Sequence, residues 1–167
     1  MKVKLLCKAA LALAAVGLFA SAASAAYKSE YKLSVVPGAS SGWGQTATFF
    51  ADCVRKKSNG RINIKPYFGA QLMAGKQTSE LLLVRRGAID FALASTINWS
   101  PQIKELNLTA LPFFIANNPN RYKALDAIEK GKSGKMLEQA IEKTGVKFIG
   151  WSENGFRELT TSKGPIE

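Results

Sequence analysis

Histidine is absent from this chain of 167 residues, and cysteine is nearly absent. Without histidine, the Ser-His-Asp and Cys-His forms of nucleophilic catalysis are excluded, as are zinc sites with an imidazole ligand. The two cysteines, Cys7 and Cys53, lie too far apart in the sequence to form the CxxC pair of a metal site or a disulfide-exchange enzyme. We therefore expect a protein that is not an enzyme and that carries no metal ion and no cofactor.

A hydrophobic run long enough to span a bilayer is also lacking. Three lysines precede an apolar run at residues 9–20, and these 12 residues are too few for a membrane core that needs about 20. Ala23-Ser24-Ala25 then provides the small residues of a signal-peptidase site. We predict that residues 1–25 are a secretory signal peptide, cleaved after Ala25, and that the mature protein is exported. An uncleaved membrane anchor is the alternative.

Acidic residues are scarce relative to basic ones, with 12 Asp and Glu against 23 Lys and Arg and a net charge of +11. The excess is concentrated in residues 26–100, which carry ten basic and four acidic side chains. Such an excess suits nucleic acid, anionic lipid or a small anionic ligand, and export of the protein argues against nucleic acid. The densest cluster, Arg55-Lys56-Lys57, has a structural explanation, because cations are favourable at the C-terminus of a helix.

Segments with strand composition alternate with amphipathic segments along the mature chain. Strands are predicted at residues 31–37, 61–67, 88–94, 146–151 and 155–161. Helices are predicted from a cap at Ser40 or Ser41 up to Asn59, at 78–86, from a cap at Asn118 to Lys130, and from a cap at Ser133 to Gly145. The first of these has an apolar face formed by Trp43, Ala47, Phe50 and Val54. This order indicates an α/β fold with a largely parallel sheet.

Two loops of this fold are the candidate binding site. Ligands of open α/β sheets bind beyond the carboxyl ends of the strands, where the strand order reverses. If the first strand lies between the second and third, the loops at 38–43 and 95–99 line this crevice. The candidate ligand contacts are Ser40, Ser41 and Trp43 from the first loop and Ser95, Thr96 and Asn98 from the second. The first loop leads into a helix N-terminus, which favours an anion, and neither loop offers a charged catalytic group.

The segment Gly42-Trp43-Gly44-Gln45-Thr46-Ala47 fits the G-x-G-x-x-A dinucleotide pattern. The Rossmann site also needs an acidic residue about 20 positions further on to bind the ribose, and the chain has none there. We therefore interpret these glycines as relieving a tight turn.

Pairs of carboxylates with the spacing of an acid–base site are missing too. Asp90, within the third predicted strand, is expected to pair with Arg85 or Arg86 rather than to transfer protons. Arg157 has two interpretations: its guanidinium matches a carboxylate ligand bidentately, or it forms a surface ion pair with Glu153 or Glu158.

Five blocks of the sequence together resemble the periplasmic solute-binding proteins of tripartite ATP-independent periplasmic (TRAP) transporters, of the DctP type. They are YKLSVVPGA, GRINIKPYFGAQL, LLLVRRGAIDFALAS, LPFFIANN and GWSENGFRELTTSKGPI. The resemblance implies a two-lobed α/β protein that closes on an organic acid, often a four-carbon dicarboxylate, and delivers it to the membrane permease subunits. It implies that Asn154, Gly155 and Arg157 match the family's Asn-Gly-x-Arg block, whose arginine contacts the ligand carboxylate. The two candidate loops match loops that supply further contacts.

The same resemblance sets the expected domain organisation. Residues 26–153 form a first lobe, residues 154–167 begin a strand that crosses to a second lobe, and that second lobe is largely missing. We expect a monomer that does not bind nucleic acid, and in which residues 26–167 alone bind dicarboxylates no tighter than the millimolar range, about −4 kcal/mol. The alternatives are a secreted interaction or structural protein that kept one lobe and lost transport, and a small secreted enzyme.

Overall fold

Three short parallel strands form the sheet of this protein. The computed structural model describes residues 27–112, 114–115, 118–153, 155, 162 and 164. The strands are β1 (Tyr31–Val35), β2 (Ile64–Tyr67) and β3 (Phe91–Leu93), in the order β2-β1-β3. Tyr31 is paired with Ile64 and Val35 with Leu93. The parallel sheet is therefore as the sequence predicts, and the first strand has the central place that was assumed for the candidate site.

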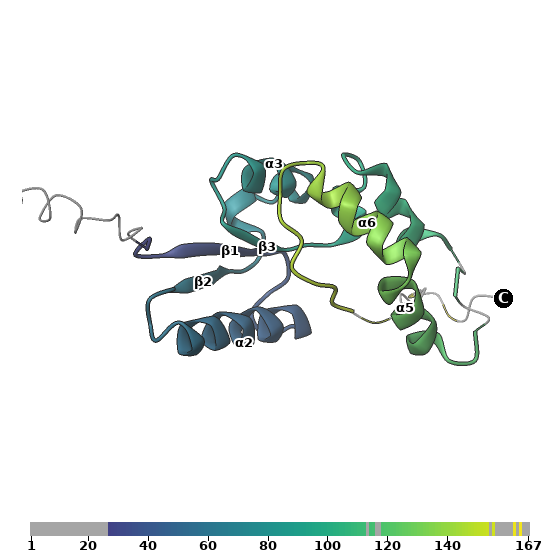
Figure 1. Cartoon of the computed structure of the whole chain (residues 1–167), viewed down its shortest axis with the longest axis horizontal. Coiled ribbons are helices and arrows are strands. Elements are labelled where there is room, and N and C mark those ends of the chain that lie inside the picture. Colours follow the sequence, from purple (N-terminus) through teal and green to yellow (C-terminus); the bar gives the residue numbers. More distant parts are fainter. Residues whose placement is uncertain are drawn as a thin grey trace, which may run out of the picture.

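Helices lie on both sides of this sheet (Figure 1). On one side is α2 (Gly42–Lys57); on the other are α3 (Glu80–Arg85) and α6 (Lys132–Glu142), with α5 (Arg121–Lys130) packed against α6. Shorter helical segments are α4 (Thr96–Trp99) and the 3₁₀ helices η1 (Gln71–Met73), η2 (Gln77–Ser79) and η3 (Lys104–Ala110). Within the described residues, no helix combines the length and the apolar character that crossing a membrane requires.

The sheet separates two main hydrophobic clusters. The first lies between the sheet and α2 and contains Leu33, Val35, Ala47, Ala51 and Ile64, with the predicted apolar face of α2 against it. The second joins α3, α4, η3 and α6 and contains Leu81, Trp99, Ile103, Leu106, Leu137, Ala140 and Ile141. The sheet contacts the first cluster through Leu33 and Val35 of β1 and the second cluster through Ala92 of β3.

The first residues of the helices can be compared with the caps predicted for them. The Ser41 Oγ accepts a hydrogen bond from the Gly44 amide at 3.0 Å and caps α2, as predicted. The prediction that Asn118 caps α5 is wrong: Asn120 is the cap, and its side chain accepts from the Lys123 amide. The side chain of Asn118, two residues earlier, accepts from the Asn120 amide.

The prediction that Ser133 caps the last helix is also wrong, because α6 begins at Lys132 with Gly131 as its cap. α6 starts this early because it follows α5 through a very tight elbow. A Cβ at Gly134 would lie 1.8 Å from the Glu129 carbonyl oxygen, so only glycine allows this approach. Close backbone packing, rather than a capping hydroxyl, sets where α6 begins.

The predicted strand at 146–151 is not a strand in this structure. Its side chains Val146, Phe148 and Trp151 pack instead against the cluster between α3 and α6. A strand needs a neighbouring strand to bond its backbone groups, and the described sheet pairs only β1 with β2 and β3. The predicted strand at 155–161 and the predicted signal peptide fall outside the described residues, except for Gly155.

Candidate ligand-binding site

The two loops predicted to contact a ligand leave the same edge of the sheet. Val35 and Leu93, the last residues of β1 and β3, are register partners, so the chain departs from neighbouring points toward 38–43 and 95–99. No hydrogen bond joins the two loops within the described residues. They are therefore two separate walls at the carboxyl edge, each held by its own contacts.

The first wall is a turn built to start α2. The Ser41 hydroxyl donates to the Gly38 carbonyl at 2.6 Å while it caps the helix, so both functions of this hydroxyl are used within the turn. Trp43 is half-buried against the cluster under α2. Ser40 is exposed, and its hydroxyl has no partner among the described residues. Of the three predicted contacts, Ser40 is the one whose side chain is available to a ligand.

Gly44 explains the glycine pattern of this turn. A Cβ at this position would lie 2.4 Å from the Ala39 carbonyl oxygen and 2.6 Å from that of Gly38. The helix can therefore approach the preceding turn closely only with glycine there, which supports a structural role over a dinucleotide site. Gly42 has open space around it. The first turn of α2 contains no acidic residue, and its positive dipole end is consequently not neutralised by its own sequence.

The second wall is α4, which Ser95 begins. The Thr96 hydroxyl accepts from the Thr109 hydroxyl at 2.8 Å, and the Asn98 side-chain amide donates to Gln77 at 3.0 Å. These two predicted contacts are thus already bonded to η3 and η2. The Ser95 hydroxyl has no partner among the described residues, although its carbonyl accepts from the amides of Asn98 and Trp99. The sequence did not single out Gln77, because its role depends on the packing of η2 beside α4.

Behind this second wall lies a buried carboxyl group that the sequence analysis missed. Glu80 is 0% exposed. Its Oε1 accepts from the Ser34 hydroxyl of β1 at 2.6 Å, and its Oε2 accepts from the Trp99 indole nitrogen of α4 at 3.1 Å. Burial raises the pKa of Glu80 above its ordinary value, and the two hydrogen bonds oppose this only in part. The only hint of this burial in the sequence is that four apolar residues follow Glu80 directly.

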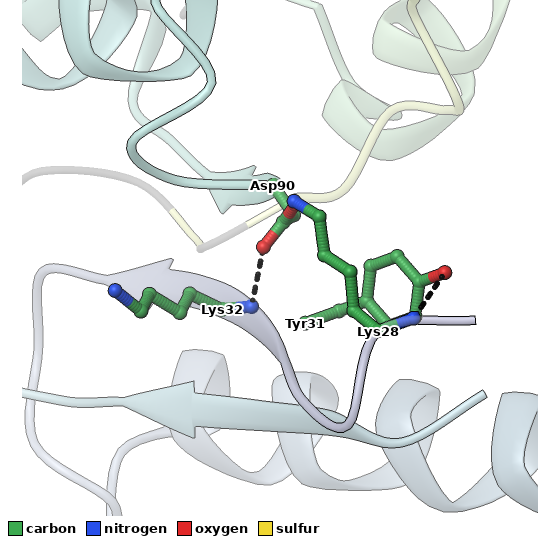
Figure 2. Close-up of polar contacts among 4 residues, drawn as sticks. All are labelled: Lys28, Tyr31, Lys32 and Asp90. Atoms are coloured by element: carbon green, nitrogen blue, oxygen red, sulfur yellow. Dashed lines mark hydrogen bonds and ion pairs between the residues drawn. The ribbon is translucent and has the colours of Figure 1, made fainter. Parts of the chain in front are cut away.

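Asp90 lies at the opposite, amino end of the sheet. Its carboxylate accepts from the Lys32 amide at 2.9 Å and forms an ion pair with Lys28, as Figure 2 shows. Its own amide donates to the Lys32 carbonyl at 3.1 Å. Burial alone would raise the pKa of Asp90, but the bonds from Lys28 and Lys32 lower it below its ordinary value. The predicted pairing with Arg85 or Arg86 is wrong, because the β1–β3 register brings Asp90 beside β1.

The remaining predicted contacts lie further along the chain. Asn154 and Arg157 are outside the described residues. Glu153, one of the two acids considered as a partner of Arg157, accepts a hydrogen bond from the Gly155 amide. The ligand contact of Arg157 stays a prediction that rests on the resemblance.

A cleft of about 390 Å³ lies elsewhere, between the helical pair α5–α6 and the segment 148–151. It is lined by Glu129, Lys130, Lys135, Glu138, Phe148, Ile149, Gly150 and Trp151. The Trp151 indole N–H is buried there, and it has no hydrogen-bond partner among the described residues. No residue of the two candidate loops lines this cleft, so it is distinct from the predicted crevice.

A parallel sheet covered on both sides by helices, with hydroxyl-bearing loops at its carboxyl edge, is the architecture of a lobe of a periplasmic solute-binding protein. Residues 33–167 match the family of bacterial extracellular solute-binding proteins, family 7, described as DctP, and the chain belongs to this family. The family consists of transporter binding proteins and is not an enzyme family. The resemblance found in the sequence is thereby confirmed.

Known relatives include a crystal structure of a TRAP periplasmic solute-binding protein from Ralstonia eutropha H16 with bound (S)-2-acetolactate. It is 52% identical, with a TM-score of 0.67 over 72% of this chain and 37% of that chain. The galactonate complex of a sugar acid-binding protein from Advenella mimigardefordensis is 25% identical, with a TM-score of 0.72 over 81% of this chain and 42% of that one. The C4-dicarboxylate-binding periplasmic protein DctP of Rhodobacter capsulatus is 26% identical over 71% of this chain and 34% of its own length. This chain thus spans roughly a third of the length of such relatives.

Proposed function

We propose that this protein is the periplasmic binding component of a TRAP transporter, which captures an organic acid anion and delivers it to the membrane permease subunits. The expected ligand class is a C4-dicarboxylate or a related carboxylate. Support comes from the ligands named for relatives, which include (S)-2-acetolactate, galactonate and C4-dicarboxylates. Each of these ligands is a carboxylate, so an anion-binding edge is the feature that they require in common.

The carboxyl edge of β1 and β3 is the observation that carries this proposal. Two loops leave this edge: one leads to the N-terminus of the 16-residue α2, which has no acid in its first turn, and the other begins at Ser95. Free N–H groups at such a terminus stabilise a carboxylate, and the unpartnered hydroxyls of Ser40 and Ser95 can donate to it. Arg157 would add a bidentate contact from the proposed crossing segment 154–167. The lobe at 26–153 supplies the other contacts.

Export is part of this proposal. Residues 1–25 act as the signal peptide, and the mature chain begins at Ala26. N-terminal sequencing of periplasmic material tests this directly. Recovery of the intact N-terminus in the membrane fraction would establish an anchor instead.

Binding is tested by titrating the ¹⁵N-labelled mature chain with succinate, galactonate and (S)-2-acetolactate, with succinamide as the uncharged control. We expect saturable shift changes with at least one acid, of millimolar affinity, about −4 kcal/mol. Ser95→Ala should weaken binding, whereas Ser29→Ala, at the amino end of β1, should not. Equal binding of succinamide, or no binding of any acid by protein that is folded and exported, would favour the one-lobed interaction protein.

A further inference from the structure

Glu80 joins the strand at the centre of the sheet to the short helix on the ligand-binding edge. Its two carboxyl oxygens each accept one bond, from Ser34 in β1 and from the indole of Trp99 at the end of α4. The described residues place no cation on this carboxyl, so its partners are two neutral donors. A buried indole N–H needs an acceptor, and Glu80 is that acceptor.

α4 depends on such outside contacts for its position. It is a helix of four residues, and a single isolated turn is not stable in water. Three hydrogen bonds tie the α4 region to the segment 77–80: Asn98 to Gln77, Gln102 to the Thr78 carbonyl, and Trp99 to Glu80. The first two are exposed to solvent, whereas the last is buried. The buried bond is the one that water cannot readily replace.

We propose that Glu80 is a positioning residue for the organic-acid site, which holds α4, and with it Ser95, Thr96 and Asn98, in place through the Trp99 indole. This inference rests on the proposed function, because α4 matters to binding only if the carboxyl edge receives the ligand. Glu80 itself is fully buried and does not contact the ligand. It acts by tying one wall of the site, through the bond from Trp99, to α3, which Glu80 begins.

Four variants separate positioning from general stability. Glu80→Met has a similar volume but removes both acceptors, and Trp99→Phe removes the indole donor. Glu80→Gln is the conservative variant, since its amide oxygen can accept from Trp99 while its nitrogen donates to the Ser34 oxygen. Ser34→Ala is the matched control, because it removes the bond to β1 and leaves the bond to α4 intact.

The first measurement is native-state hydrogen exchange at the amides of Trp99 and Ser100, which donate to the carbonyls of Ser95 and Thr96. We expect Glu80→Met and Trp99→Phe to accelerate exchange there about 10-fold while the amides of α2 are unchanged. Glu80→Gln and Ser34→Ala should exchange like the wild type at α4. Equal acceleration in α2 and α4 in the Met and Phe variants, or no acceleration at α4, would show that Glu80 has only a general structural role.

The second measurement is the titration with succinate and (S)-2-acetolactate. Glu80→Met and Trp99→Phe should each weaken binding about 10-fold, and the double variant should weaken it no further. Glu80→Gln should bind the acids with wild-type affinity. Unchanged affinity in a Glu80→Met protein with a lower melting temperature would overturn the positioning role. If the wild type binds no organic acid, the proposed function fails, and the exchange at α4 still decides whether Glu80 holds this helix.

Discussion

The carboxyl groups at the two ends of the sheet have different kinds of partner. At the amino end, Asp90 pairs with Lys28, and Glu30, just before β1, pairs with Lys65. At the carboxyl end, the buried Glu80 meets only a hydroxyl and an indole. Acid and base therefore neutralise each other at one end. At the other end, the hydroxyls of Ser40 and Ser95 have no partner among the described residues, and the first turn of α2 contains no acid. The difference shows why an incoming anion is expected at the carboxyl end.

The largest expected effect is a loss of stability caused by overpacking at the carboxyl end of the sheet. Gly44→Ala places a Cβ 2.4 Å from the Ala39 carbonyl oxygen, so the turn at 38–43 must move away from α2. We expect a loss of about 3 kcal/mol in the free energy of unfolding. Chemical denaturation measures it. Gly42→Ala is the control, because nothing lies within 4 Å of its added Cβ, and it should keep wild-type stability.

The next effect concerns the affinity of the proposed site. Arg157→Lys keeps the positive charge but loses the planar fork that grips two carboxylate oxygens. We expect a loss of about 2 kcal/mol in binding free energy, roughly 30-fold in affinity, with little change in melting temperature. Calorimetric titration with the best ligand of the panel tests this. A destabilised Arg157→Ala protein with unchanged affinity would establish the surface ion pair instead.

The pH dependence of stability sharpens the comparison between the two carboxyl groups. Because the pKa of Glu80 is raised in the folded state, its contribution to stability is fully present below the ordinary glutamate range and is lost as the pH rises through the folded pKa. The stability of the wild type should therefore fall relative to Glu80→Gln as the pH rises above about 4.3. Urea denaturation of both proteins from acid to neutral pH measures this difference, and parallel curves would contradict it.

Asp90 should behave in the reverse sense. Its pKa is lowered in the folded state, so its contribution is present above the ordinary aspartate range and is lost as the pH falls through the folded pKa. In the same series, the stability advantage of the wild type over Asp90→Asn should shrink toward low pH. An advantage that grows on acidification would show that the bonds from Lys28 and Lys32 do not favour the ionised form.

The smallest expected effect is at the exposed partner of Asp90. Lys28→Met removes an ion pair in which the lysine side chain is 56% exposed, and such pairs contribute at most about 1 kcal/mol. Stability should fall slightly, less so in high salt, and ligand affinity should not change. Lys56→Met, at the exposed end of α2, is the control. A weaker organic-acid affinity in Lys28→Met would indicate that the anion binds at the amino end of the sheet, against the proposal.

Features of the fold that depend on neighbouring residues in the sequence were predictable. The cap at Ser41, the apolar face of α2 and the three parallel strands follow from capping chemistry and periodicity. Whether 146–151 forms a strand depends on a partner elsewhere in the fold, and composition alone cannot supply that information. The early start of α6 likewise depends on the elbow with α5, which only the packed backbone reveals.

The candidate site likewise has features that were predictable from the sequence and features that were not. The shared edge of the two loops was predictable once the first strand was assumed to be central, because parallel strands end together. That Thr96 and Asn98 are bonded to η3 and η2 was not, since those partners lie in segments without regular periodicity. Glu80 was missed for a different reason: an acid in the first turn of a helix is ordinarily explained by the helix dipole and solvent exposure.

The three tryptophans occupy three unlike surroundings, and this gives the protein built-in optical probes. Trp43 belongs to α2 and packs against the cluster between this helix and the sheet, and Trp99 donates to a carboxyl group. Trp151, beside the α5–α6 cleft, has an indole N–H with no hydrogen-bond partner among the described residues. Indole emission and the indole proton resonance respond to charge and hydrogen bonding in the immediate surroundings. Variants that keep one tryptophan at a time would therefore report separately on the helix beneath the sheet, on the α4 wall and on the segment after α6, without any added label.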